Sequence, residues 1–215
     1  MKLYYNPLST YCQKVLIAFY EKGMDCEREI VNLMSPEGRA AFEKISSIGK
    51  IPYLKPSADW QVPESTSIIE YLEDKFPRTT RLIPAAGGDA ARQVRFMDRM
   101  ADFYLNDPVT ELLFQKFGYR QPNEEAAARA RKYVNVSYTH YEQRLASQTW
   151  ICGETFSLAD CATIPPLYYA QLAASFDSFP NVVAYWKRAQ KRSSYAKVKA
   201  EFEPIWQGMM EKNAA

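Results

Sequence analysis

The first 77 residues alternate between short apolar segments with the period of a strand and longer segments with the period of a helix. We expect strands at 2–5, 27–33, 52–54 and 60–62, and helices at 11–22, 36–45 and 65–76. Pro52 stands at the first position of its strand, one of the few places where a strand tolerates proline. The order predicts a small α/β domain of about four strands with helices packed on it.

From residue 78 the pattern changes, and no further strand signal follows. Residues 78–88 contain Pro84, Gly87 and Gly88 and are predicted to be a linker. Helical periodicity then covers 89–118, 123–147, 157–173, 180–191 and 194–212. We therefore expect an α/β domain over 1–77, the linker 78–88, and an all-helical domain over 89–215.

Charge narrows the range of partners. The chain has 27 Lys and Arg against 25 Asp and Glu, and no run of five or six like charges. This balance argues against nucleic acid or a membrane surface as partner. No segment approaches the roughly 18 apolar residues of a membrane span, and the N-terminus lacks the apolar core of a signal peptide. We expect a cytoplasmic protein whose partners are small molecules or proteins.

The cysteines and the single histidine do not form a metal site. Cys12, Cys26, Cys152 and Cys161 show no CxxC spacing, so we expect reduced thiols and no disulfide framework. His140 lies in a polar helical stretch, and no Cys/His set has the spacing of a zinc site. We expect no bound metal.

Three predicted helix starts carry hydroxyl side chains. Ser9 and Thr10 follow the first strand and stand where the first helix begins, a place suited to holding an anion. Ser65 is expected to be the N-cap of the third helix. Ser157 and Asp160 have the form of a capping box, which we interpret as structural because so occupied an Asp is a poor base.

Four motifs resemble those of the cytosolic glutathione transferases. STYCQKVLIAFYEKG (9–23) is similar to that family's first loop and helix, GKIPYL (49–54) to its G-K-(V/I)-P-x-L segment, VPESTSIIEYLEDKFP (62–77) to its E-S-x-x-I-x-x-Y-L turn and third helix, and GETFSLADC (153–161) to its N-capping box. They occur in the family's order over almost the whole chain. The chain is identified as a member of this soluble family, of a bacterial type with a theta/delta-like, serine-type site.

The resemblance implies a thioredoxin-like N-terminal domain with a four-stranded mixed sheet, and an all-α bundle after it. Glutathione would be a cosubstrate, with no permanently bound cofactor. Ser65 would hold the γ-glutamyl carboxylate at a helix N-terminus, and Glu64 would accept from the neighbouring ammonium. Ile51, before Pro52 that the family holds cis, would pair with the cysteinyl peptide as an added strand.

Three polar residues are candidates for the glycyl carboxylate. Lys50 is the nearest cation, and Lys14 and Gln13 on the first helix are weaker candidates. A solvated loop charge is the alternative interpretation of Lys50.

The thiol end depends on the first loop. Theta- and delta-type enzymes carry S-x-P-C-R-x-V, whose serine donates a hydrogen bond to the thiolate and lowers the pKa of the thiol. Ser9 matches that serine, Thr10 is the alternative, and Tyr5 is a third option as in tyrosine-type members. Tyr11 replaces the proline and Gln13 the arginine, so the subclass stays open.

Cys12 stands where thioredoxin-like folds place a redox cysteine. The motif here is S-x-x-C, with only the second thiol, so we interpret Cys12 as a small buried residue of the first helix.

The electrophile site would lie between the domains. Its candidates are Leu8, Phe96, Met100, Phe103 and Tyr104, with Arg99, Asp107 and Tyr168 as further members. The equal alternative is that this aromatic and methionine face is interdomain core.

The predicted function is conjugation of the glutathione thiolate to hydrophobic electrophiles by a cytoplasmic homodimer. The alternatives are a glutathione-dependent thiol transferase or reductase that uses Cys12, and a non-catalytic interaction module of the same fold. A glutathione-dependent isomerase, dehalogenase or lignin-ether lyase is a narrower possibility.

Overall fold

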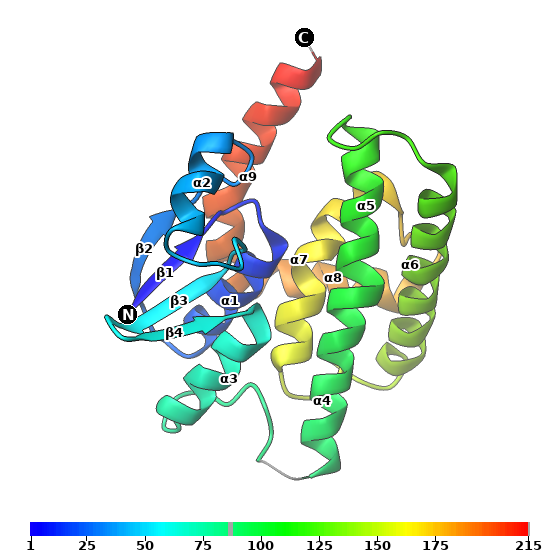
Figure 1. Ribbon diagram of the computed structural model, residues 1–215. Coiled ribbons are helices and arrows are strands. Elements are labelled where there is room, and N and C mark those ends of the chain that lie inside the picture. Colours follow the sequence, from blue (N-terminus) through cyan, green and yellow to red (C-terminus); the bar gives the residue numbers. More distant parts are fainter. Residues whose placement is uncertain (86–87, 215) are drawn as a thin grey trace. The chain divides into compact units, whose positions relative to one another are not determined.

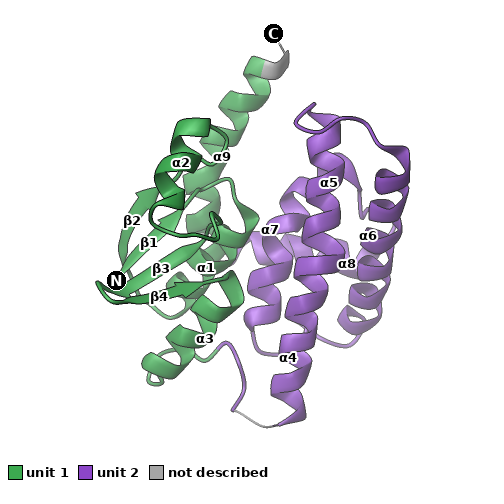
Figure 2. Ribbon diagram, in the orientation of Figure 1, with its two compact units in different colours: residues 1–81, 193–215 green, residues 82–192 purple. Residues whose placement is uncertain are grey.

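The computed structural model describes residues 1–85 and 88–214. The chain forms two compact units (Figure 2). One, here called the sheet unit, combines residues 1–81 with the C-terminal helix, and the other, the helical unit, comprises residues 82–192.

The sheet unit contains a mixed four-stranded sheet. Its strands are β1 (Lys2–Tyr5), β2 (Glu27–Ile30), β3 (Tyr53–Ser57) and β4 (Trp60–Pro63), in the order β2-β1-β3-β4. β1 runs parallel to β2 and antiparallel to β3, which pairs antiparallel with β4. β3 begins at Tyr53, one residue after Pro52, and it includes Pro56 near its end.

Both faces of the sheet are covered by helices (Figure 1). These are α1 (Thr10–Glu21), α2 (Pro36–Glu43) and α3 (Ser65–Lys75). Tyr4 packs with Phe42 of α2 and with Tyr53, at ring distances of 5.8 and 6.1 Å. Leu3, the next residue of the strand, is fully buried and points to the opposite face, where α1 and α3 lie.

The helical unit is built from α4 (Asp89–Met100), a π-helical segment η1 (Ala101–Asn106), α5 (Asp107–Lys116), α6 (Glu124–Leu145), α7 (Leu158–Ala173) and α8 (Pro180–Gln190). α4, η1 and α5 follow one another within the predicted helix 89–118, but the π-helical widening was not predicted. There the N–H of Asp107 donates to the carbonyl of Asp102, and the Ser137 hydroxyl donates to the Tyr104 carbonyl at 2.8 Å. The side chain from α6 thus satisfies a carbonyl in the widened turn.

The C-terminal helix α9 (Ser193–Ala214) belongs to the sheet unit by its contacts, although we expected this segment in the helical domain. Tyr195, Val198 and Phe202 are buried, and Glu201 accepts hydrogen bonds from Tyr20 and from Arg28.

The predicted linker 78–88 is only partly described, since residues 86 and 87 lie outside the described residues. Leu82 and Ile83 within it are buried, and the Leu82 carbonyl accepts from the N–H of Leu158 at 2.9 Å. Leu82 and Ile83 are therefore packed within the helical unit, whereas residues 78–81 belong to the sheet unit. In the described ranges, no helix is both long enough and apolar enough to cross a membrane.

Candidate active site

The loop after β1 brings Ser9 to the N-terminus of α1. Ser9 is the N-cap, and its hydroxyl oxygen accepts from the N–H of Cys12 at 3.4 Å. A hydroxyl that accepts in this way still has one O–H to donate. The side chain is partly exposed, so it offers a donor at a helix end whose dipole favours an anion.

The two other candidates for the thiol end differ in their surroundings. Thr10 is the first residue of α1 and is partly exposed, beside Ser9. Tyr5 is buried at the end of β1, where burial, and then the charge of Glu201, raise the pKa of its phenol. Arg28 opposes this shift. The Tyr5 phenol thus lies among the charges that join β2 to α9.

Cys12 is fully buried in α1, as expected for a small apolar residue. Burial raises the pKa of its thiol to about 12, and the smaller opposing effects of the Ser9 hydroxyl and the Asn6 N–H do not offset it. At neutral pH the thiol is therefore protonated, and a protonated thiol is a poor nucleophile.

The start of α3 is the second part of the site. Glu64, not Ser65, is the N-cap of this helix, so the prediction of Ser65 as N-cap was wrong. Ser65 is the first helical residue and is 4% exposed, while the Glu64 side chain is exposed. Glu64 has φ +68 and ψ 130, a backbone conformation that side chains with a Cβ rarely adopt. The reason for the wrong assignment is this turn, which places Glu64 at the cap position.

Between these two helix starts, the segment before β3 has the expected backbone. The Ile51–Pro52 peptide bond is cis. Ile51 packs against the cluster around Tyr4 and Phe42, and Pro52 is buried. Lys50 is exposed in the preceding turn.

Gln13 and Lys14 are buried inside the sheet unit, at 0% and 1% exposure. The Gln13 amide donates to the Pro7 carbonyl at 2.8 Å, and the Lys14 ammonium donates to the Thr66 hydroxyl at 3.0 Å. Neither is placed as a surface ligand for a carboxylate. Lys14 instead connects α1 to the first turn of α3.

The candidates for the electrophile site are divided between the two units. Leu8 belongs to the sheet unit, and its N–H donates to the Asn6 side chain at 3.0 Å. Phe96, Met100, Phe103 and Tyr104 belong to the helical unit. Three of these four side chains are exposed there, but Met100 is only 5% exposed and packs as a core residue.

The exposed aromatic residues near η1 have neighbours within the helical unit. The Arg99 guanidinium lies 5.9 Å from the ring centre of Phe103, and Tyr104 packs on Tyr133 at 5.2 Å. Tyr168, a further candidate, is partly exposed and packs on Tyr169.

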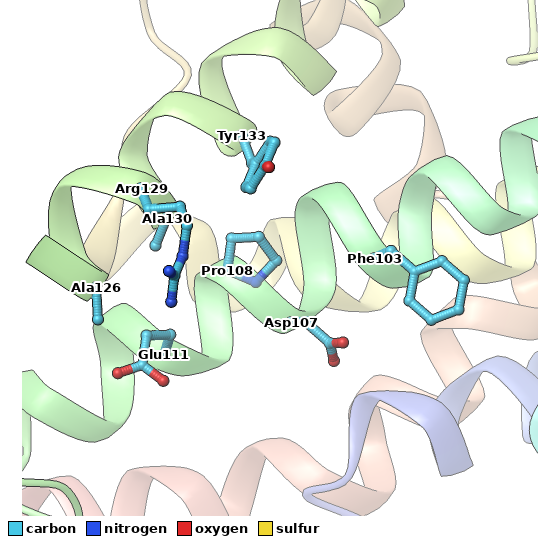
Figure 3. Close-up of a pocket in the computed structure, with 8 residues that line it drawn as sticks. All are labelled: Phe103, Asp107, Pro108, Glu111, Ala126, Arg129, Ala130 and Tyr133. Carbon is cyan, nitrogen blue, oxygen red and sulfur yellow. The ribbon is translucent and has the colours of Figure 1, made fainter.

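A cavity of about 220 Å³ opens beside this segment, between α5 and α6 (Figure 3). Its lining residues are Phe103, Asp107, Pro108, Glu111, Ala126, Arg129, Ala130 and Tyr133. Two of the candidates, Phe103 and Asp107, are among them. Figure 3 shows Arg129 extending toward Glu111 and Tyr133 lying above Pro108. The cavity combines aromatic surface with charges of both signs.

Sequence reasoning gave Asn6 no role, yet this residue organises the loop that carries Ser9. Its side-chain oxygen accepts from the N–H of Leu8 at 3.0 Å, and its amide donates to the Val31 carbonyl at 3.0 Å. An Asn followed by Pro at the end of a strand is a turn signal, which could have indicated the first contact but not the second. Among the described residues, no group of His, Cys, Asp and Glu is arranged to hold a metal ion.

Two domain models of one family match the chain. The glutathione S-transferase N-terminal domain matches residues 3–80, and the glutathione S-transferase C-terminal domain matches residues 100–192. Together they cover most of the 215 residues. The chain belongs to the glutathione S-transferase family.

Curated relatives and solved structures agree with this membership. Glutathione S-transferase F13 of Arabidopsis thaliana is 27% identical over 211 residues, covering 92% of this chain and 94% of the relative. Glutathione S-transferase hmp2 of Hypomyces subiculosus is 27% identical, covering 94% and 98%. The crystal structure of glutathione transferase F7 from Populus trichocarpa has a TM-score of 0.80 and 26% identity, covering 93% and 97%.

These findings confirm the predicted fold class, a thioredoxin-like domain with a four-stranded mixed sheet and an all-helical domain. The prediction of a glutathione transferase is confirmed as well.

Proposed function

We propose that this glutathione transferase binds reduced glutathione along the sheet unit, from the start of α3 to the start of α1, and transfers its thiolate to hydrophobic electrophiles. The γ-glutamyl carboxylate would meet the N–H and hydroxyl of Ser65, and the γ-glutamyl ammonium would meet the exposed Glu64. Ile51, before the cis bond to Pro52, would pair with the cysteinyl peptide. The exposed Lys50 would meet the glycyl carboxylate.

At the thiol end, Ser9 would act as the hydrogen-bond donor. The bound thiol loses its proton to solvent, and the Ser9 O–H stabilises the thiolate, so the pKa of the thiol falls. The thiolate then forms a C–S bond with the electrophilic carbon, which either expels a leaving group with its electron pair or, after addition, takes a proton from solvent. The rate comes from a larger thiolate fraction and from proximity, without covalent attack by the protein.

The observation that carries this proposal is the position of Ser9, a partly exposed hydroxyl at the N-cap of α1. It also supports the finer proposal of a theta/delta-like, serine-type site. Cys12 supports it indirectly, because a buried thiol with a pKa of about 12 is unsuited to thiol transfer.

The Ser9→Ala variant tests the proposal in conjugation of glutathione to a chlorinated nitrobenzene. We expect kcat/KM to fall about 10- to 100-fold, because a hydrogen bond to a charged group contributes about 1.5–3 kcal/mol. Ser35→Ala is the matched control, since Ser35 caps α2 by accepting from the N–H of Gly38 at 3.0 Å. The Ser35→Ala variant also loses an N-cap hydroxyl, but at α2 and not at the proposed thiol site.

Unchanged kcat/KM in Ser9→Ala would move the donor role to Thr10 or Tyr5. A mixed disulfide on Cys12 after incubation with glutathione disulfide would favour the thiol transferase, and no glutathione binding by calorimetry would favour the non-catalytic module.

We also propose that the exposed aromatic residues Phe96, Phe103 and Tyr104 of the helical unit form the acceptor surface, for electrophiles with apolar aromatic surface. A glutathione-dependent isomerase, dehalogenase or lignin-ether lyase would use the same thiolate with a different acceptor. The proposed state is a cytoplasmic homodimer with glutathione as cosubstrate, and sedimentation velocity tests the dimer.

A further inference from the structure

Asn6 makes four hydrogen bonds around the loop that carries Ser9. Its side-chain amide donates to the Val31 carbonyl at 3.0 Å, and its side-chain oxygen accepts from the N–H of Leu8 at 3.0 Å. Its backbone carbonyl accepts from the N–H of Ser9 at 3.0 Å, and its backbone N–H donates to the Cys12 sulfur at 3.5 Å.

These contacts join three elements at one residue. The Val31 N–H donates to the Tyr5 carbonyl at 2.8 Å, so the chain after β2 is already fixed to the end of β1. The Asn6 amide binds the carbonyl of that same Val31 and thereby ties the loop to the sheet. The contacts to Ser9 and Cys12 tie the other end of the loop to α1. Asn6 is therefore fixed from both sides.

The side-chain contacts decide how well the Ser9 hydroxyl is held. Ser9 is only partly buried, and the loop leading to it is three residues long, Asn6 to Leu8. An Asx turn alone is a local contact that forms and breaks readily in a surface loop. The bond to Val31, 25 positions away, is the contact that holds this turn against the rigid sheet. A hydrogen bond weakens steeply when its distance and angle change, so a loop held in this way keeps the donor where a thiolate needs it.

We propose that Asn6 is a positioning residue for the thiol end of the site: its amide bond to Val31 fixes the loop so that the Ser9 hydroxyl can donate to the bound glutathione thiolate. This inference rests on the proposed role of Ser9. Asn6 itself does not touch the sulfur in this proposal. Because Asn6 acts through Ser9, its substitution should change the pKa of the bound thiol. It should not change the affinity for the γ-glutamyl end of glutathione.

The test measures the pKa of the thiol in the enzyme–glutathione complex by the ultraviolet absorbance of the thiolate, together with the Kd of glutathione by calorimetry. Asn6→Ala removes both side-chain contacts, and Asn6→Ser keeps a short acceptor for the turn but cannot reach Val31. We expect Asn6→Ala to raise the pKa of the bound thiol by about one unit, which lowers the thiolate fraction about tenfold at pH values well below that pKa. Asn6→Ser should give a similar rise, because the bond to Val31 is lost in both, and Kd should stay within about twofold.

The matched control is Asn32→Ala. Asn32 makes the same turn contact, since its side-chain oxygen accepts from the N–H of Met34 at 3.0 Å, but in the exposed loop after β2. We expect no change in the pKa of the bound thiol in this variant. In a Ser9→Ala background, Asn6→Ser should have no further effect, because residues that act through one another are not additive.

The outcomes separate this inference from the proposed function. A normal pKa of the bound thiol in both Asn6 variants, with glutathione bound, overturns the positioning role and leaves the Ser9 proposal intact. An effect of Asn6→Ser that persists in the Ser9→Ala background also overturns it. Absence of a lowered thiol pKa in the unmodified protein overturns the proposed role of Ser9 itself. Should Asn6→Ala fail to fold, the milder Asn6→Ser carries the test.

Discussion

At the scale of single residues, Glu64 has an unfavourable backbone conformation at a position where the proposed function needs its carboxylate. It is the one described residue other than glycine with positive φ, at +68. Such a conformation costs on the order of 1–3 kcal/mol and persists only where the surrounding structure determines it. The paired strand that ends at Pro63 and the helix that begins at Ser65 hold Glu64 from both sides. We expect that this strain is tolerated because the carboxylate is needed at that place.

The substitution Glu64→Gly tests whether Glu64 costs folding stability and contributes to glutathione binding. Glycine adopts positive φ readily, so we expect the free energy of unfolding to rise by about 1 kcal/mol, measured by urea denaturation. Loss of the carboxylate should raise the Kd of glutathione about tenfold, measured by calorimetry. Glu64→Gln is the control, because it removes the charge and keeps the strained backbone. A Glu64→Gly variant that is no more stable than Glu64→Gln would show that the turn is not strained.

At the scale of elements, the start of α7 depends on one buried carboxylate. Asp160 is fully buried and accepts four hydrogen bonds, from the N–H and the hydroxyl of Ser157, the N–H of Ile151 and the hydroxyl of Tyr185. The predicted capping box is therefore present. The Asp160 carboxylate also binds Ile151, in the chain before the helix, and Tyr185 of α8. Burial nevertheless raises the pKa of Asp160 to about 6.

This pKa predicts a pH dependence of stability. Folding raises the pKa of this carboxyl from 3.8 to about 6, so the folded state binds the proton more tightly than the unfolded state. The resulting stabilisation of the folded state is complete below pH 3.8. That contribution, on the order of 3 kcal/mol, is lost as the pH rises through the folded pKa. Urea unfolding at about pH 4 and about pH 7 measures it. Asp160→Asn, which cannot titrate, should lose more stability relative to the unmodified protein at the lower pH. If Asp160→Asn lost the same free energy of unfolding at both pH values, the raised pKa of Asp160 would be contradicted.

At the scale of the whole molecule, the two compact units do not follow the order of the chain. The C-terminal helix α9 returns to the sheet unit after the helical unit is complete, and the second family domain model ends at residue 192, just before it. Phe202 is fully buried and Ser194 donates to Glu21 of α1, so apolar packing and polar contacts both fix α9 there. We infer that the sheet unit needs this helix for its own stability.

The pair Phe202→Ala and Ile205→Ala tests this dependence. Phe202 is buried, whereas Ile205 on the same helix is 44% exposed. We expect Phe202→Ala to lower the free energy of unfolding by about 3–5 kcal/mol, and Ile205→Ala to change it by no more than about 0.5 kcal/mol. Urea denaturation measures both. Equal effects would show that α9 does not stabilise the unit through this face.

The sequence by itself determined the order and type of the elements, because apolar periodicity, Gly, Pro and capping residues act over a few neighbouring positions. The helices predicted at 123–147, 157–173 and 180–191 lie within about three residues of α6, α7 and α8. The motif around Ser9 and the segment Ile51–Pro52 were also evident, since short motifs carry their own backbone requirements.

Tertiary structure decided what depends on distant partners. An apolar stripe shows that α9 buries one face, but not that this face belongs to the sheet unit. A serine before a helix suggests a cap, but the turn out of β4 placed Glu64 there and made Ser65 the first helical residue. Asn6 reaches the Val31 carbonyl only because β1 and β2 are neighbours in the sheet. Local pattern thus fixed the elements, and packing between residues far apart in the chain fixed how the site is held.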